Sequence, residues 1–210
     1  MPKFITSTLL LLFLTATVHS QKILEKQYDA KSLKTLVING NSVFEIHVIA
    51  ESRNTISLKA TIAGETSNDV MITEQDNQSK LQLGIKYAPY FTAINDKLSA
   101  HKVLSVILEY RIPEKMNVEI GSDIGSFWGR GVFKNLNVSL ERGNCFISNY
   151  FGNATIMTLI GDVDIAVIGN VSGVGISKNG TVLNNLSRGH VTNISVESRD
   201  GNISLTQTEK

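Results

Sequence analysis

Two acidic residues stand two positions apart in the segment Gly161-Asp162-Val163-Asp164-Ile165. In an extended strand, residues i and i+2 lie on the same side and about 7 Å apart. Inverting glycosidases hold their two carboxyl groups in this range. Asp162 and Asp164 are therefore the candidate acid and base of a polysaccharide-active enzyme. The same pattern is typical of a solvent-facing strand, and we favour that interpretation.

Other side chains that could perform catalysis or bind a metal do not form a known pattern. Three histidines occur after residue 20: His47, His101 and His190. They lie far apart in the sequence and lack the spacing typical of metal ligands. A calcium site would need Asp162, Asp164 and Asp200 to converge, and the nine-residue calcium repeat is absent. The chain also lacks a nucleophile elbow and a phosphate loop. We therefore predict no catalytic residues, no metal, no cofactor and no enzymatic activity.

Aromatic side chains are the candidate binding residues. Trp128 lies in the glycine-rich stretch 125–131, and if Phe127 points inward, strand alternation turns Trp128 outward. Tyr150 lies at a second predicted corner, 149–152, and we expect it to be exposed. The other candidates fall in a predicted insertion and are Tyr87, Tyr90 and Phe91. Exposed aromatic rings stack on sugars or anchor a protein partner. The alternative is that these rings cover edges of the core.

Cys145 is the single cysteine of the chain. A chain with one thiol has no internal disulfide, so its stability must come from core burial and backbone pairing. Cys145 stands in the apolar run Asn144-Cys145-Phe146-Ile147, which favours a small buried core residue over a reactive thiol.

The residues between these candidates predict an all-β domain. Residues 36–38, 43–49, 56–62, 70–73, 81–85 and 103–112 are β-branched or alternate with period two, which indicates strands. We assign residues 21–116 to a part with longer strands, interrupted by an insertion at 86–102. No stretch has the pattern of a long, capped helix.

Residues 117–206 carry a glycine-marked repeat. The corner glycines are Gly125, Gly143, Gly161, Gly180 and Gly201. Two positions after them stand Phe127, Cys145, Val163, Val182 and Ile203. Glycine permits sharp corners, and equal spacing stacks the inward residues of successive turns into columns. The repeat predicts a coil of short strands, a parallel β-helix or β-roll. An antiparallel sandwich with evenly spaced hairpins is the alternative. Asn184 stands four positions after Gly180, where the other repeats have mainly apolar residues, and it therefore requires a hydrogen-bond partner.

The N-terminal residues predict export. Lys3 precedes an apolar run from Phe4 to Val18, and small or short residues follow up to Ser20. This is the pattern of a cleaved signal peptide, residues 1–20, although an uncleaved anchor remains the alternative. The chain has 20 basic and 19 acidic side chains, and removal of Lys3 leaves 19 of each. A neutral chain without basic clusters disfavours binding to nucleic acid or to anionic lipid. We predict no membrane span after cleavage.

The chain resembles the putative bacterial adhesin family of the auto-transporter head, GIN-domain type. The likeness rests on Leu36-Val37-Ile38-Asn39-Gly40-Asn41 and on the rungs Gly161-Asp162-Val163-Asp164-Ile165 and Asp200-Gly201-Asn202-Ile203-Ser204-Leu205. It covers nearly all of residues 21–206. The resemblance implies a single-stranded right-handed β-helix and a bacterial envelope protein. The corner sequence Gly-Ala-Ser-Asp of that family has only one near match here, Gly121-Ser122-Asp123.

These observations favour a non-enzymatic, adhesin-like protein in the periplasm, in the outer cell envelope or outside the cell. Its expected partners are a glycan or an envelope protein. The alternatives are a polysaccharide-active β-helix enzyme and a structural or stress-response envelope component. We assign residues 21–206 to one domain, followed by the polar tail 207–210. Because the last rung would end at Leu205 with little sequence after it, the open end of the coil predicts a homo-oligomer or blunting by this tail.

Overall fold

The structure is a computed structural model that describes residues 21–89 and 104–208. The predicted signal peptide and most of the predicted insertion lie outside these residues, including Tyr90, Phe91 and His101. Within the described parts, no helix is long and apolar enough to cross a membrane.

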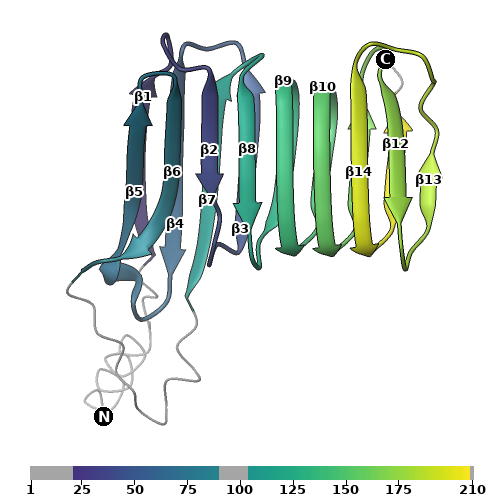
Figure 1. Cartoon of the computed structure of the whole chain (residues 1–210). Coiled ribbons are helices and arrows are strands. Elements are labelled where there is room, and N and C mark those ends of the chain that lie inside the picture. Colours follow the sequence, from purple (N-terminus) through teal and green to yellow (C-terminus); the bar gives the residue numbers. More distant parts are fainter. Residues whose placement is uncertain (1–20, 90–103, 209–210) are drawn as a thin grey trace, which may run out of the picture.

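The described residues form strands almost throughout (Figure 1). The strands are β1 (Lys22–Asp29), β2 (Thr35–Asn39), β3 (Glu45–Glu51), β4 (Thr55–Ala63), β5 (Val70–Asn77), β6 (Lys80–Tyr87), β7 (Ser105–Pro113), β8 (Asn117–Ser122), β9 (Ser126–Arg142), β10 (Cys145–Ile160), β11 (Val163–Val167), β12 (Ser172–Ser177), β13 (Val182–Asn184), β14 (Asn193–Asp200) and β15 (Ile203–Gln207). A short 3₁₀ helix, η2 (Ser67–Asp69), precedes β5. The prediction of an all-β fold is confirmed.

Alternating side chains explain why these segments are strands. In β3 and β4 every second residue is buried, and the side chains of Ile46, Val48 and Ile56 are fully inaccessible. Period-two alternation turns the apolar residues of each strand toward one side, where burial stabilises the sheet. The strands predicted between residues 36 and 112 are all present, with boundaries shifted by a few residues.

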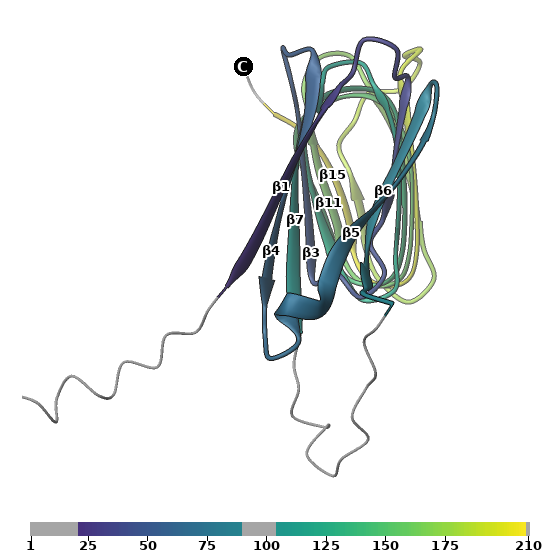
Figure 2. The same cartoon turned by 90° about the vertical axis from the view of Figure 1, so that its left-hand side faces the viewer.

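The strands form two layers that face each other across the core (Figures 1 and 2). The front layer of Figure 1 contains β5, β6, β2, β8, the second half of β9, the second half of β10, β14 and β12 in spatial order. The back layer contains β1, β4, β7, β3, the first half of β9, the first half of β10, β11, β15 and β13. Because β9 and β10 run from one layer into the other, the layers belong to one continuous sheet around a common interior.

The expectation of a parallel β-helix over the whole domain is not confirmed, because the sheet is mixed. The strands of the glycine-marked repeats pair in parallel with one another. The pairs β3–β9 and β2–β8, which join the repeats to the N-terminal part, are also parallel. Pairing is antiparallel between β1 and β4, β4 and β7, and β5 and β6. All antiparallel pairs of the described strands lie in residues 22–113. This part of the chain lacks the regularly spaced corner glycines of the repeats.

The rungs do not stack in sequence order. β14 lies between β10 and β12 in the front layer, and β15 lies between β11 and β13 in the back layer. The expectation that the strand ending at Leu205 closes the coil is therefore wrong. The end of the coil is the β12–β13 rung (Figure 1). The first residues of the tail stay beside β11, because the Thr208 N–H donates a hydrogen bond to the Val167 carbonyl over 2.8 Å.

The column predicted after the corner glycines exists. Phe127, Cys145, Val163 and Ile203 are in register on neighbouring strands and are at most 1% exposed. Val182 follows Ile203 in this column, and its side chain is 42% exposed. It is exposed because β13 is an edge strand, with no rung beyond it in the described part of the chain.

The column of inward residues on β10 and β14 is interrupted at the end of the coil. Ile156 and Val196 are in register, but the next position is Gly175, and Ile176 points outward with 62% exposure. A Cβ on Gly175 would lie 3.0 Å from Ile203 and 3.1 Å from Val182. Side chains of the back layer therefore reach the backbone of β12, and the interior closes there without a separate cap.

Corner glycines stack on one another and leave no room for a side chain. Gly143 and Gly161 adopt φ of +142° and +151°. A Cβ on Gly161 would collide with the carbonyl oxygen of Gly143, and a Cβ on Gly143 with that of Gly125. Both the backbone conformation and the packing require glycine here.

Candidate binding groove

The predicted carboxylate pair is divided between two roles. Asp162 lies at a corner, where its Oδ1 accepts the Asn202 N–H over 2.7 Å. Its own N–H donates to Asn144 Oδ1, and the Thr181 N–H donates to Asn202 Oδ1 in the same manner. Asp162 is thus one step of a ladder in which a side-chain oxygen caps the next corner. Asp164 is not part of this ladder, and its side chain is exposed.

The other acidic candidate, Asp200, is held by neighbours of its own. Its carboxylate accepts 2.7 Å hydrogen bonds from Asn179 Nδ2 and Arg199 Nε. These bonds, that of Asn179 first, lower the pKa of Asp200 below its usual value. Among the described residues, no three His, Cys, Asp or Glu side chains gather as metal ligands.

Trp128 lies in the middle of an aromatic row on the outer side of the back layer. The row is formed by His47, Trp128 and Phe146, which are in register on β3, β9 and β10. The rings of His47 and Trp128 stack with centroids 4.8 Å apart and planes 5° from parallel. The rings of Trp128 and Phe146 lie 5.6 Å apart and are tilted by 34°. His47 Nε2 lies 2.9 Å from Glu45 Oε2, which holds the imidazole in place.

This row corrects the expected role of Trp128. Because a neighbouring ring covers each side of the indole, Trp128 supports the row rather than offering an open face. Phe146 has Trp128 on one side and the short β11 on the other, so its second side borders the groove. The sequence contained a signal for Phe146 and Asp164, because each stands three positions after a corner glycine, as Trp128 does.

The aromatic row lines a groove of about 460 Å³. The aromatic row forms one side of the groove. Glu109 on β7 and Asp164 on β11 extend this side, because Glu109 is in register with His47 and Asp164 with Phe146. The next outward row on the same strands supplies Ile49, Arg111, Arg130, Ser148 and Ala166. An adjoining hollow of similar volume shares Glu109 and Arg111 and extends to β1. The two hollows adjoin at Glu109 and Arg111, and together they are called the channel below.

Charges at the two ends of the channel differ. Toward β1 they are paired: Lys59 Nζ lies 3.2 Å from Glu109 Oε2, and Arg111 Nη1 lies 3.1 Å from Glu51 Oε2. Toward β11, Arg130 and Asp164 are exposed and make no hydrogen bond or ion pair with any described residue. Exposed ion pairs contribute little to stability, but an unpaired guanidinium and carboxylate in a groove are available to a ligand.

Tyr150 is buried, contrary to the expectation. Its hydroxyl donates to the Asn153 carbonyl over 2.7 Å, and its ring lies 5.8 Å from that of Phe133. Asn149 has a positive φ of 49°, and the pairing of β10 with β11 shifts between Ile147 and Tyr150. A β-bulge of this kind changes the phase of the alternation and turns Tyr150 inward.

Tyr87 and Cys145 lie away from the groove surface. Tyr87 is 41% exposed at the end of β6, in the front layer, so the fold does not bring it to Trp128. Cys145 is fully buried, and burial raises the pKa of its thiol. The interpretation of Cys145 as a core residue is confirmed. Asn184, at the edge of the coil, has the partner that it required, because its Nδ2 donates to the Gly173 carbonyl over 2.7 Å.

The comparisons with known proteins show the fold of the chain. No family model matches the sequence, and no curated protein matches it. A crystal structure of a putative cell adhesion protein from Clostridium sporogenes aligns with a TM-score of 0.66 at 16% identity, covering 90% of this chain and 100% of that one. A putative adhesin from Bacteroides fragilis aligns with a TM-score of 0.37 at 11% identity, covering 90% of this chain and 99% of that one. Because its TM-score is below 0.5, the second alignment supports no argument. The first shows that the chain shares its architecture with the Clostridium protein.

Proposed function

We propose that this protein is an exported, non-enzymatic, adhesin-like binding protein that holds a glycan or a surface protein in the groove of the back layer. The aromatic row beside unpaired Arg130 and Asp164 carries this proposal. A groove built on paired strands loses little conformational entropy when a ligand binds, which favours affinity. The fold shared with a protein described as a putative cell adhesion protein agrees with this role.

The finer parts of this proposal concern export, family and assembly. We propose cleavage after residue 20 and a location in the periplasm, at the outer envelope or outside the cell. Membership of the GIN-domain type, with a right-handed helical path through the repeats, belongs to the same proposal. A further partner is a second copy of the chain at the β12–β13 end of the coil.

Cell binding by groove variants tests the proposed function. Purified mature protein is added to bacterial or host cells, and the bound fraction is measured for wild type, Trp128→Ala and Phe146→Ala. Both variants should reduce the affinity by at least about tenfold, because aromatic side chains at the centre of a binding surface are enriched among the residues whose truncation costs most affinity. Tyr87→Ala is the matched control, because it removes an aromatic ring from the opposite layer. Thermal unfolding must show that each variant is folded.

Two results would contradict the proposal. Unchanged cell binding by Trp128→Ala and Phe146→Ala would remove the groove as the binding surface. Turnover of a polysaccharide by wild type that is lost in Asp162→Asn would support the enzyme alternative instead. Asp162→Asn retains the Oδ1 acceptor that caps Asn202, so loss of activity in this variant would not reflect loss of the corner.

A further inference from the structure

We propose that the ligand of the groove is an acidic glycan, with Arg130 as the contact for a sugar carboxylate and Phe146 as the surface against which the sugar ring lies. This inference rests on the proposed function, because it names the ligand class of the same groove.

The charge arrangement favours an anionic ligand at Arg130. Its partners in register are Ile49 on β3 and Ser148 on β10, and neither carries a charge. The other cations that line the channel are each close to a carboxylate: Lys26 to Glu74, Lys59 to Glu109 and Arg111 to Glu51. The Arg130 guanidinium therefore has no partner among the described residues, and a planar guanidinium binds a carboxylate with two parallel hydrogen bonds.

The surroundings of Phe146 leave space for a ring. Trp128 covers one side of Phe146, while the β11 side is bordered by the shorter side chains Asp164 and Ala166. An apolar ring face packs against an aromatic ring, and a free carboxylate accepts hydrogen bonds from hydroxyl groups. A sugar offers both an apolar face and hydroxyl groups, so it can contact Phe146 and Asp164 together.

Strand pairing disfavours a peptide in this position. Each strand beneath the groove is paired on both sides: β3 with β7 and β9, β9 with β3 and β10, β10 with β9 and β11, and β11 with β10 and β15. The groove therefore offers no free backbone edge to which an extended peptide could add as a strand. Recognition has to use side chains, which suits a glycan.

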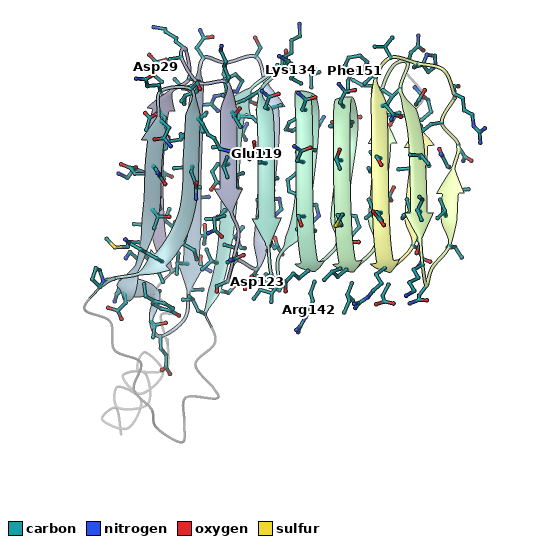
Figure 3. The ribbon with its side chains drawn as sticks, viewed as in Figure 1. Asp29, Glu119, Asp123, Lys134, Arg142 and Phe151 are labelled. Atoms are coloured by element: carbon teal, nitrogen blue, oxygen red, sulfur yellow. The ribbon has the colours of Figure 1, made fainter. Side chains whose placement is uncertain are left out.

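Calorimetry with matched oligosaccharides tests this inference. The probes are tetragalacturonate and its carboxyl-reduced counterpart, which has the same linkages without the carboxylates. Wild type should bind tetragalacturonate at least about tenfold more tightly, because a hydrogen bond to a charged group contributes that much. Arg130→Gln should remove this preference, and Asp164→Ala, which removes the acceptor for the sugar hydroxyl groups, should weaken binding of both probes. Arg142→Gln, an exposed arginine at the far end of β9, is the control and should retain the preference (Figure 3).

The outcomes separate this inference from the proposed function. Equal binding of the two probes, or an unchanged preference in Arg130→Gln, would overturn the acidic-glycan assignment. Failure to bind either probe, together with cell binding that depends on Trp128, would overturn the ligand class while supporting the groove as the adhesive surface. Added salt should weaken the Arg130-dependent part of binding, because salt screens exposed charges.

Discussion

At the scale of the residue, the position of a side chain relative to the corner glycine determines its role. The third position after the glycine points outward and provides Trp128, Phe146 and Asp164 of the groove. The second position points inward and provides Cys145 and its column. The bulge at Asn149 shows the limit of this rule, because one additional residue reverses the phase and buries Tyr150. Alternation predicted the outward direction of Trp128 correctly, because no bulge precedes it in β9.

The buried thiol gives a prediction at this scale. Because burial raises the pKa of Cys145, the thiolate is scarce in the folded protein even at pH 8, and solvent cannot reach the sulfur. A thiol-reactive dye should therefore not label the native protein on a timescale of minutes. In guanidinium chloride the same dye should label one thiol per chain. Rapid native labelling with unchanged circular dichroism would contradict the buried assignment.

At the scale of the element, each corner is fixed by a glycine and by a polar cap. Gly161 fits against the carbonyl of Gly143, and Asp162 then caps the following rung at Asn202. These contacts repeat along the coil and explain why Asp162, a candidate acid from its sequence spacing, has a structural role. The sequence predicted the corners, because positive φ and close approach both require glycine. It did not predict the ladder, whose steps join residues 18, 21 and 40 positions apart in the sequence.

Alanine at a corner tests this account. Gly161→Ala should lower the free energy of unfolding by about 2 kcal/mol or more, because it combines an unfavourable φ with a backbone collision. Gly121→Ala is the matched control, since a Cβ there meets no atom within 4 Å. Its effect should stay within about 0.5 kcal/mol. Urea unfolding monitored by circular dichroism gives both values, and equal effects of the two substitutions would contradict the stacked-corner model.

At the scale of the whole molecule, the two ends of the sheet differ. At the N-terminal end, side chains of β1 in the back layer bind to the front layer at and before β5. Lys22 Nζ donates to the carbonyls of Asn68 and Val70, and Tyr28 Oη donates to Glu74. At the C-terminal end, one edge of β12 and one edge of β13 pair with no described strand, and Ile176 and Leu183 are exposed by 62% and 53%. Unpaired edges with apolar side chains favour association with another strand.

Self-association is therefore expected at this end. We expect a dimer in which β12 pairs with β12 of a second copy, because such a contact closes on itself. Analytical ultracentrifugation should detect a concentration-dependent dimer, and Ile176→Lys should shift the protein toward the monomer, since edge lysines prevent strand pairing. Val191→Lys, at a fully exposed position outside the strands, is the control and should leave association unchanged. A monomer at every concentration would exclude β12 as an interface.

The sequence by itself determined the features that depend on neighbours along the chain. Period-two alternation predicted the strands, the glycine spacing predicted the corners, and the apolar run around the single cysteine predicted a core residue.

Only the tertiary structure decided the order of the rungs and the composition of the groove. Val163 can pack against Ile203 or Val182, because both are apolar and stand at the same position in their rungs. Gly173 and Gly175 leave β12 with little to bury, so its rung lies at the end and the β14–β15 rung lies inside. His47 joins Trp128 and Phe146 because β3 pairs with β9, a contact between segments about 80 residues apart that no local pattern encodes.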